Sequence, residues 1–225
     1  MSSYDKNLKI PVDGITLEGI LAVPDNPIGL VIFSHGSGSS RLSPRNNFIA
    51  RELQRMGIAT LLFDLLTAEE DEVYSQRFNI ALLSERLMKV TRWTEELSWV
   101  NTLPIGYFGA STGAASALTA AAQLPFMIKA VVSRGGRPDL AVGLKDVKAP
   151  TLLIVGENDP EVMRLNEEAR KQMTCSCALR KIKGATHLFE EPGTLEEVAG
   201  LACDWFITYL NNLEVSVNRQ KQQEH

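Results

Sequence analysis

The chain has 225 residues, of which 44% are hydrophobic and 22% are charged, and its formal net charge is −4. That length can bury a sizeable core as one α/β domain, which we expect over residues 1–213, followed by a polar, frayed tail over 214–225. A chain without a basic surplus is not expected to bind nucleic acid. No run approaches the roughly 20 apolar residues of a membrane span, so no membrane association is expected.

Several features favour a cytoplasmic protein with reduced thiols. Residues 1–6 show no basic segment followed by an apolar one, as a secretory signal would require. Cys175 and Cys177 are too close in sequence for an easy mutual bridge. The histidines and cysteines show no zinc-binding spacing, so no metal is expected. The sequence leaves the oligomeric state open.

The first half of the chain predicts a hairpin and then a β-α-β unit. Two strands flank the turn pair Asp13-Gly14 and start the sheet antiparallel. The continuous apolar run of residues 29–34 is typical of a strand buried on both faces. The expected elements are strands over 8–12, 16–23, 29–34 and 58–63, with a helix over 48–56. Residues 65–76 are acidic without clear periodicity, which predicts a loop.

The second half alternates strands with helices. Apolar residues recur at helical spacing from Ile80 to Leu97, which predicts one long helix before Pro104. Further strands are expected over 105–110, 129–133, 151–155 and 177–182, with helices after 111, over 161–173 and over 195–213. This alternation predicts an α/β fold with a mostly parallel, doubly wound sheet of about seven or eight strands and no sizeable cap domain.

One short segment, Gly109-Ala-Ser-Thr-Gly113, lies between an expected buried strand and an Ala-rich helix. Such a strand, sharp turn and helix make a nucleophile elbow, in which a strained serine needs small neighbours. The segment therefore predicts Ser111 as a nucleophile.

A serine hydroxyl needs a base to take its proton as it attacks. His187 follows the last expected strand and is the predicted base; the alternative is a histidine in a surface loop. Asp159 follows the preceding strand and is predicted to orient His187, although it could instead cap a helix that opens at Pro160. Asp139, one strand earlier, is the competing acid.

Acyl transfer also needs donors for the oxyanion that develops at the attacked carbonyl. The backbone N–H groups of Thr112, at a helix start, and of Ser37, in a glycine-rich loop, are the predicted donors. The loop could instead be a plain turn. A third interpretation is a dinucleotide site, since Gly36-x-Gly38-x-x-Arg41 and Asp64 faintly resemble that fingerprint.

Four motifs together resemble the α/β-hydrolase superfamily: His35-Gly-Ser-Gly38, Gly109-Ala-Ser-Thr-Gly113, Gly156-Glu-Asn-Asp159 and Gly184-Ala-Thr-His187. The match extends over nearly the whole chain. The small size and the lack of an obvious cap resemble the dienelactone hydrolase-like branch, which includes hydrolase domains fused to phosphoribosyltransferases. The resemblance implies a triad of Ser111, Asp159 and His187, an oxyanion hole near Ser37 and Thr112, and no cofactor.

The chain departs from the family pattern at two places. Position 111 is serine where true dienelactone hydrolases carry cysteine, so the resemblance does not extend to dienelactone as the substrate. The fourth strand is followed by Asp64-Leu-Leu-Thr-Ala-Glu-Glu70, whereas many members have a Gly-x-Gly loop there. The mouth of the site is therefore expected to differ.

The expected function is that of a serine hydrolase acting on a small-molecule ester, thioester or lactone. The alternative is a non-catalytic binding or regulatory protein on the same scaffold. Arg41, Arg134 and Arg137 fall in loops expected near the site. They are expected to be solvated surface residues, with selection of an anionic substrate as the alternative.

Overall fold

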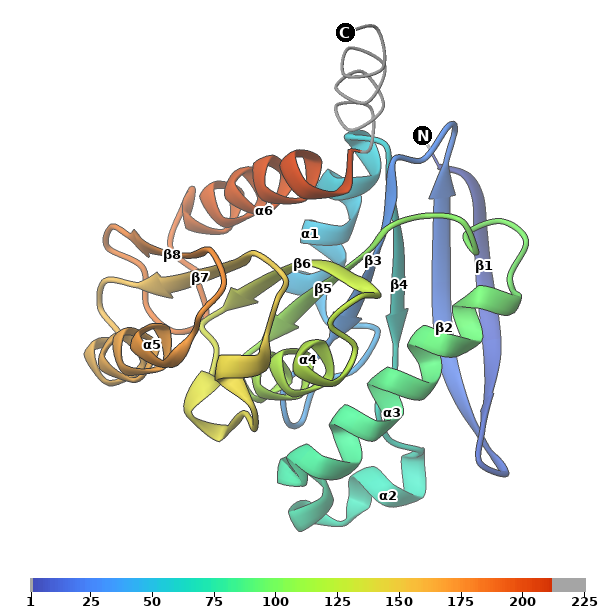
Figure 1. Cartoon of the computed structure of the whole chain (residues 1–225), viewed down its shortest axis with the longest axis horizontal. Helices are drawn as coiled ribbons and strands as arrows, with labels where there is room; N and C mark the ends of the chain where they lie inside the picture. The colour runs from blue at the N-terminus through green and yellow to red at the C-terminus, as the bar shows by residue number, and fades with distance from the viewer. Residues whose placement is uncertain (1, 212–225) are drawn as a thin grey trace, which may run out of the picture.

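The computed structural model describes residues 2–211, and the predicted tail, 214–225, lies outside the described residues. An eight-stranded sheet in the order β1-β2-β4-β3-β5-β6-β7-β8 runs through this part of the chain (Figure 1). The strands are β1 (Ser2–Val12), β2 (Ile15–Pro24), β3 (Gly29–Ser34), β4 (Ile58–Phe63), β5 (Ile105–Ala110), β6 (Ile128–Arg134), β7 (Thr151–Gly156) and β8 (Cys177–Ile182). The β1–β2 and β2–β4 pairs are antiparallel and the others are parallel, which confirms the predicted mostly parallel sheet.

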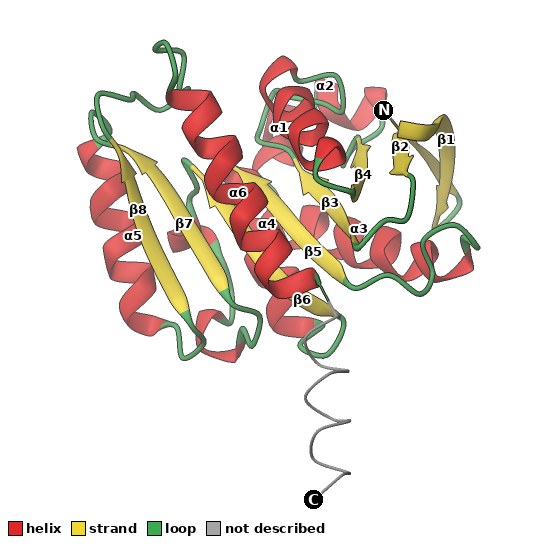
Figure 2. Cartoon of the chain, turned by 90° about the horizontal axis from the view of Figure 1, so that it is seen from above, coloured by secondary structure: helices red, strands yellow, loops and turns green. Residues whose placement is uncertain are grey.

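Helices cover both faces of the sheet (Figures 1 and 2). The helices are α1 (Pro44–Arg55), α2 (Ala68–Glu72), α3 (Ile80–Trp93), α4 (Thr112–Gln123), α5 (Pro160–Gln172) and α6 (Thr194–Leu210), with short 3-10 turns η1 (Tyr74–Phe78), η2 (Thr94–Glu96), η3 (Pro138–Leu140) and η4 (Leu144–Asp146). On one face α1 packs against α6, and on the other α3 packs against α4. None of the helices in residues 2–211 is both long and apolar enough to span a membrane.

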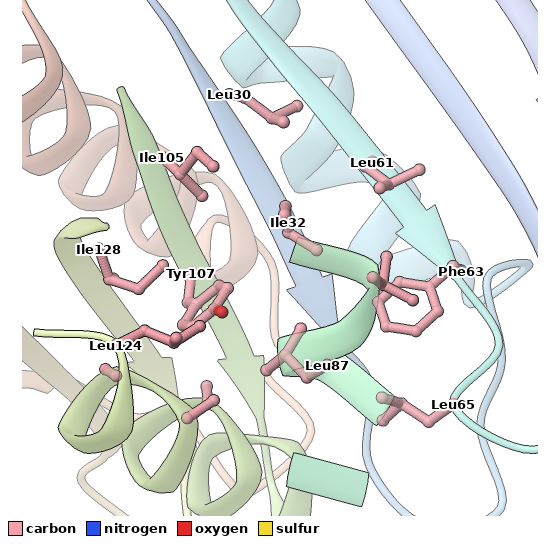
Figure 3. Close-up of a cluster of buried hydrophobic side chains, with 14 of the residues drawn as sticks. Leu30, Ile32, Leu61, Phe63, Leu65, Leu87, Ile105, Tyr107, Leu124 and Ile128 are labelled. Carbon is pink, nitrogen blue, oxygen red and sulfur yellow. The ribbon is translucent and has the colours of Figure 1, made fainter. Parts of the chain in front are cut away.

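Side chains of the central strand β3 contribute to two apolar cores, one on each face of the sheet. Its side chains alternate between the faces, so Leu30 and Ile32 join the core under α3 and α4, while Val31 and Phe33 join the core under α1 and α6. Figure 3 shows the first of these cores, in which Tyr107 of β5 is fully buried. Both faces of β3 are thus covered by apolar side chains.

The prediction of a loop over residues 65–76 is wrong, because α2 and part of η1 occupy this stretch. Thr67 and Glu70 form a capping box: the Thr67 side chain accepts from the Glu70 N–H, and the Glu70 side chain accepts from the Thr67 N–H. None of the α2 side chains is buried. Without a buried face α2 leaves no apolar period in the sequence, and the Thr-x-x-Glu pattern is its one local signal.

Several element boundaries also differ from those predicted. The first strand begins at Ser2, well before residue 8. The long helix ends at Trp93 rather than at Leu97, and the 3-10 turn η2 follows it. The last helix ends at Leu210, and Leu213 lies outside the described residues. Leu97 still packs against the apolar core, which explains why the helical spacing extends beyond the helix.

The parallel strands β3 to β8 end at one edge of the sheet. Figure 2 shows β7 and β8 side by side and pointing the same way, with α6 on one face. Loops that follow these strands therefore meet at this edge, where ligands bind in open α/β sheets.

Candidate active site

Ser111 occupies a strained turn between β5 and α4. Its φ is +52° and its ψ is −123°, a conformation that residues other than glycine rarely adopt. Hydrogen bonds hold this turn against the end of β6 and the loop that follows it. The Ser111 N–H donates to the Arg134 carbonyl over 3.1 Å, and the Ser111 carbonyl accepts from the N–H groups of Ala114 over 3.0 Å and of Arg137 over 3.1 Å.

The glycines of the elbow are required by close approach of the backbone. A Cβ at Gly113 would lie 2.1 Å from the carbonyl oxygen of Ser34, at the end of β3, and a Cβ at Gly109 would lie 2.5 Å from the backbone of α4. A Cβ at Gly36 would lie 3.1 Å from the Ser111 Cβ. The elbow and the loop after β3 are thus in direct contact, which explains why small residues stand at these positions.

His187 and Asp159 form the main polar pair at this edge. His187 Nδ1 lies 2.7 Å from Asp159 Oδ2, with 40% of the histidine side chain and 15% of the aspartate side chain exposed. Asp159 stands at the N-cap position of α5 but makes no capping hydrogen bond with its side chain. The carboxylate therefore contacts the imidazole and does not cap the helix. With Nδ1 as donor, the Nε2 of a neutral ring is an acceptor.

The loops after β7 and β8 approach closely and are linked by hydrogen bonds. This approach brings Asp159 close to His187. A Cβ at Gly156 would lie 2.4 Å from the Ala185 carbonyl oxygen, so the two loops approach closely. Asn158 donates from its backbone to Ala185 over 2.8 Å and from its side chain to the Gly184 carbonyl over 2.9 Å.

Asp139, the competing acid, lies in η3 and is engaged elsewhere. Its two carboxylate oxygens accept from Arg137 over 2.9 and 2.8 Å. Within residues 2–211 no hydrogen bond joins Asp139 to His187.

Ser111 and His187 line the same cavity, which has a volume of about 220 Å³. No hydrogen bond joins these two side chains in the described part of the chain. A larger cavity, of about 620 Å³, lies beside the same loop and shares Ser39 with the first one, but neither Ser111 nor His187 lines it. The smaller cavity, called the serine cavity below, is therefore where chemistry at Ser111 would occur.

The two predicted oxyanion donors lie next to each other. The Ser37 N–H donates to Thr112 Oγ1 over 2.8 Å. Thr112 is the first residue of α4, so the helix itself does not engage its N–H. The structure thus joins Ser37 to the first turn after Ser111, with the threonine hydroxyl as the present acceptor.

His35 links this loop to the loop after β4. Its Nδ1 donates to the Gly36 carbonyl over 2.9 Å, and its Nε2 accepts from the Leu65 N–H over 3.1 Å. Burial lowers the pKa of His35 below its usual value. The ring is a neutral structural connector with both nitrogens engaged.

The three arginines named from the sequence have different surroundings. Arg41 pairs with Asp64 through its side chain and donates its N–H to Asp64 Oδ1 over 2.7 Å, so the carboxylate of the dinucleotide interpretation is already engaged. Arg137 pairs with Asp139. Arg134 is only 7% exposed and lines the serine cavity, so the expectation of a solvated surface arginine is wrong for this residue.

The sequence did not predict two residues that line the serine cavity. Arg45 and Asn46 lie in the first turn of α1, which begins four residues earlier than predicted. Ser43 and Pro44 mark this start, because Ser is a favoured N-cap and Pro a favoured first residue of a helix. Nothing local indicates that the first turn faces Ser111.

The described residues contain no group of three or more His, Cys, Asp or Glu side chains placed to hold a metal ion. The sheet order, the elbow and the meeting of loops at one edge define a protein of the α/β-hydrolase type. The model of the dienelactone hydrolase family matches residues 17–212, so the chain belongs to that family.

Several known proteins are similar to this chain. A dienelactone hydrolase from Anabaena variabilis has 50% sequence identity and a TM-score of 0.89, over 92% of this chain and 98% of that one. Est1E from Butyrivibrio proteoclasticus shares the fold, with a TM-score of 0.77 at 20% identity over 90% of this chain and 98% of its own. Putative phosphoribosyl transferases from two Mycobacterium tuberculosis strains, CDC 1551 / Oshkosh and H37Rv, are 53% identical over 92% of this chain. The chain spans 47% of the length of these mycobacterial relatives.

Proposed function

We propose that this chain is a serine hydrolase that cleaves a carboxylic ester, thioester or lactone through an acyl-enzyme. The observation that carries the proposal is the 2.7 Å pair of His187 and Asp159 at the cavity that also holds Ser111 on its strained elbow. Membership of the dienelactone hydrolase family supports the hydrolase class.

In the first half-reaction Ser111 Oγ attacks the carbonyl carbon, and its proton passes to His187 Nε2. Asp159 stabilises the imidazolium and keeps Nε2 directed at the serine. When the tetrahedral intermediate collapses, the bond to the leaving group breaks and the leaving group takes the proton from His187. In the second half-reaction water attacks the acyl-serine, gives its proton to His187, and releases the acid as Ser111 Oγ recovers that proton.

The charge on the intermediate is held by the N–H groups of Ser37 and Thr112 in this mechanism. Since the Ser37 N–H donates to Thr112 Oγ1, it must share or exchange that acceptor when the oxyanion forms. The Thr112 hydroxyl therefore accepts the hydrogen bond of the Ser37 N–H and holds this donor at the site.

The name of the mycobacterial relatives suggests a transferase, but this chain spans only 47% of their length. We propose hydrolysis for the part that this chain matches and the named transferase activity for the remainder of those proteins.

A fluorophosphonate probe tests the proposal directly, because it phosphonylates only a serine that a neighbouring base activates. We expect labelling of Ser111 in the wild type, none in Ser111→Ala, and much weaker labelling in His187→Ala. A folded wild-type protein that is not labelled would instead support a non-catalytic binding protein. A panel of p-nitrophenyl esters, thioesters and lactones, ranked by kcat/KM, then identifies the bond that is cleaved.

A further inference from the structure

Arg134 is a buried cation beside the nucleophile. Its residue is 7% exposed, it lines the serine cavity, and no carboxylate in residues 2–211 forms an ion pair with it. Its side-chain contacts are a long hydrogen bond from Nη2 to Asn46 Oδ1, 3.4 Å, and the ring of Phe189, whose centroid is 5.8 Å from Cζ. Its Nε is buried without a hydrogen-bond partner. A buried charge with so few partners is costly, so a reason beyond packing is needed for it.

A second guanidinium lines the same cavity. Arg45 also has a buried Nε without a hydrogen-bond partner, while its Nη1 lies 3.0 Å from the exposed carboxylate of Glu190. Burial, with the charge of Arg45 nearby, lowers the pKa of Arg134 to about 10. Arg134 therefore remains charged at neutral pH, and both cations stay in place although each disfavours the other.

The start of α1 adds to the positive potential. Arg45 and Asn46 belong to the first turn of this 12-residue helix, which is capped by Ser43, and all three residues line the cavity. The N-terminal end of a helix carries a partial positive charge. Two arginines, each with a buried Nε that lacks a hydrogen-bond partner, and a helix N-terminus thus line a cavity that has no carboxylate among its lining residues.

We propose that the serine cavity binds an anionic group of the substrate, a carboxylate or a phosphate, through Arg134 and Arg45. This inference rests on the proposed function, because the anionic group and the bond that Ser111 attacks belong to one small molecule. A volume of about 220 Å³ leaves room for a short chain that ends in the anion. Guanidinium groups suit this role, since their planar donors match two oxygens of one carboxylate or phosphate.

The contribution of the side chain of Arg134 can be separated from that of its backbone. The hydrogen bond that holds the elbow uses the Arg134 carbonyl, which a substitution retains. Arg134→Met therefore removes the charge without removing this contact. Exchanging a buried unpaired charge for an apolar side chain of similar length is expected to leave the melting temperature unchanged or higher.

The first test compares a charged and a neutral ester of similar length, the p-nitrophenyl monoester of glutarate and p-nitrophenyl pentanoate. The wild type is expected to prefer the charged ester. Arg134→Met and Arg45→Met are each expected to lower kcat/KM for the charged ester by about 10- to 100-fold, and far more than for the neutral one. Arg51→Met, at an exposed position of the same helix, is the matched control and should change neither value.

The second test measures binding without turnover. Inorganic phosphate and glutarate are titrated separately into the wild type, both arginine variants and the Arg51→Met control by calorimetry. Binding of at least one anion to the wild type and control, and its loss in both arginine variants, supports the site; the tighter anion identifies phosphate or carboxylate as the preferred group. If Arg134→Met does not fold, the test uses Arg45→Met alone, because Arg45 is partly exposed and its substitution disturbs the fold less.

The outcomes separate this inference from the proposed function. If neither anion binds, or if the variants lose both esters equally, the anion site is wrong while probe labelling of Ser111 still supports the hydrolase. If the anions bind as expected but Ser111 is not labelled, the cavity binds anions and the hydrolase proposal fails.

Discussion

His187 Nδ1 and Asp159 Oδ2 lie 2.7 Å apart although they belong to different loops, after β8 and β7. The carboxylate stands where it could cap α5 and makes no such bond. The geometry therefore favours Asp159 over Asp139, which is held by Arg137.

Removing one carboxylate charge separates the two candidate acids. Asp159→Asn is expected to lower kcat by roughly 10⁴-fold, because an amide cannot stabilise the imidazolium and favours the wrong tautomer of His187. Asp139→Asn should leave kcat close to the wild type, since its partner is Arg137. Steady-state kinetics on one activated ester measures both, and the reverse pattern would move the assignment to Asp139.

The backbone donor at Ser37 can be removed while its position is kept. Ser37→Pro eliminates the N–H, and we expect kcat to fall by about 10²- to 10³-fold, the loss typical of one oxyanion donor. Ser37→Ala keeps the N–H and serves as control, with kcat expected near the wild-type value. Circular dichroism of both variants shows that the fold is retained. Equal rates in the two variants would mean that Ser37 does not donate to the oxyanion.

Two helical glycines should respond to alanine in opposite directions. Gly113→Ala places a Cβ against the Ser34 carbonyl, and we expect the free energy of unfolding to fall by about 3 kcal/mol or more. A Cβ at Gly200, in α6, meets nothing within 4 Å, so Gly200→Ala should raise that free energy by about 0.5–1 kcal/mol. Urea denaturation of the two variants checks both signs, and a mild effect at Gly113 would contradict the close packing of the elbow on β3.

The buried His35 predicts a loss of stability on the acid side of neutrality. Its pKa is lowered in the folded state by burial, so below its usual value of 6.5 the unfolded chain takes up a proton that the folded chain does not. Its contribution is therefore complete above about pH 6.5 and decreases as the pH falls towards the folded-state pKa. The melting temperature of His35→Gln should depend less on pH in this range than that of the wild type. An equal slope in wild type and His35→Gln would refute the effect.

Local sequence was enough to place the elbow and the order of the polar residues along the chain. The Gly-Ala-Ser-Thr-Gly pattern between an apolar run and an Ala-rich segment specifies the turn at Ser111, because only glycine permits the close backbone approach at positions 109 and 113. Strands that alternate with helices place the loops of Ser111, Asp159 and His187 at one edge, since parallel strands share a direction. The elbow depends on residues that are close together in the sequence, and the shared position of the three loops follows from the strand topology.

The surroundings of Arg134 and Arg45 were decided by tertiary structure alone. Arg134 is the last residue of the apolar strand β6 and Arg45 is the second residue of α1, and in sequence both have the character of surface charges. Their position beside Ser111 depends on how α1 and the end of β6 meet at the sheet edge. The contact of Ser37 with Thr112 depends on how the elbow packs against the loop after β3. Periodicity and motif spacing predict the order of the elements and which of their faces are buried. The partners of a polar side chain, in contrast, are set by elements that are distant in sequence.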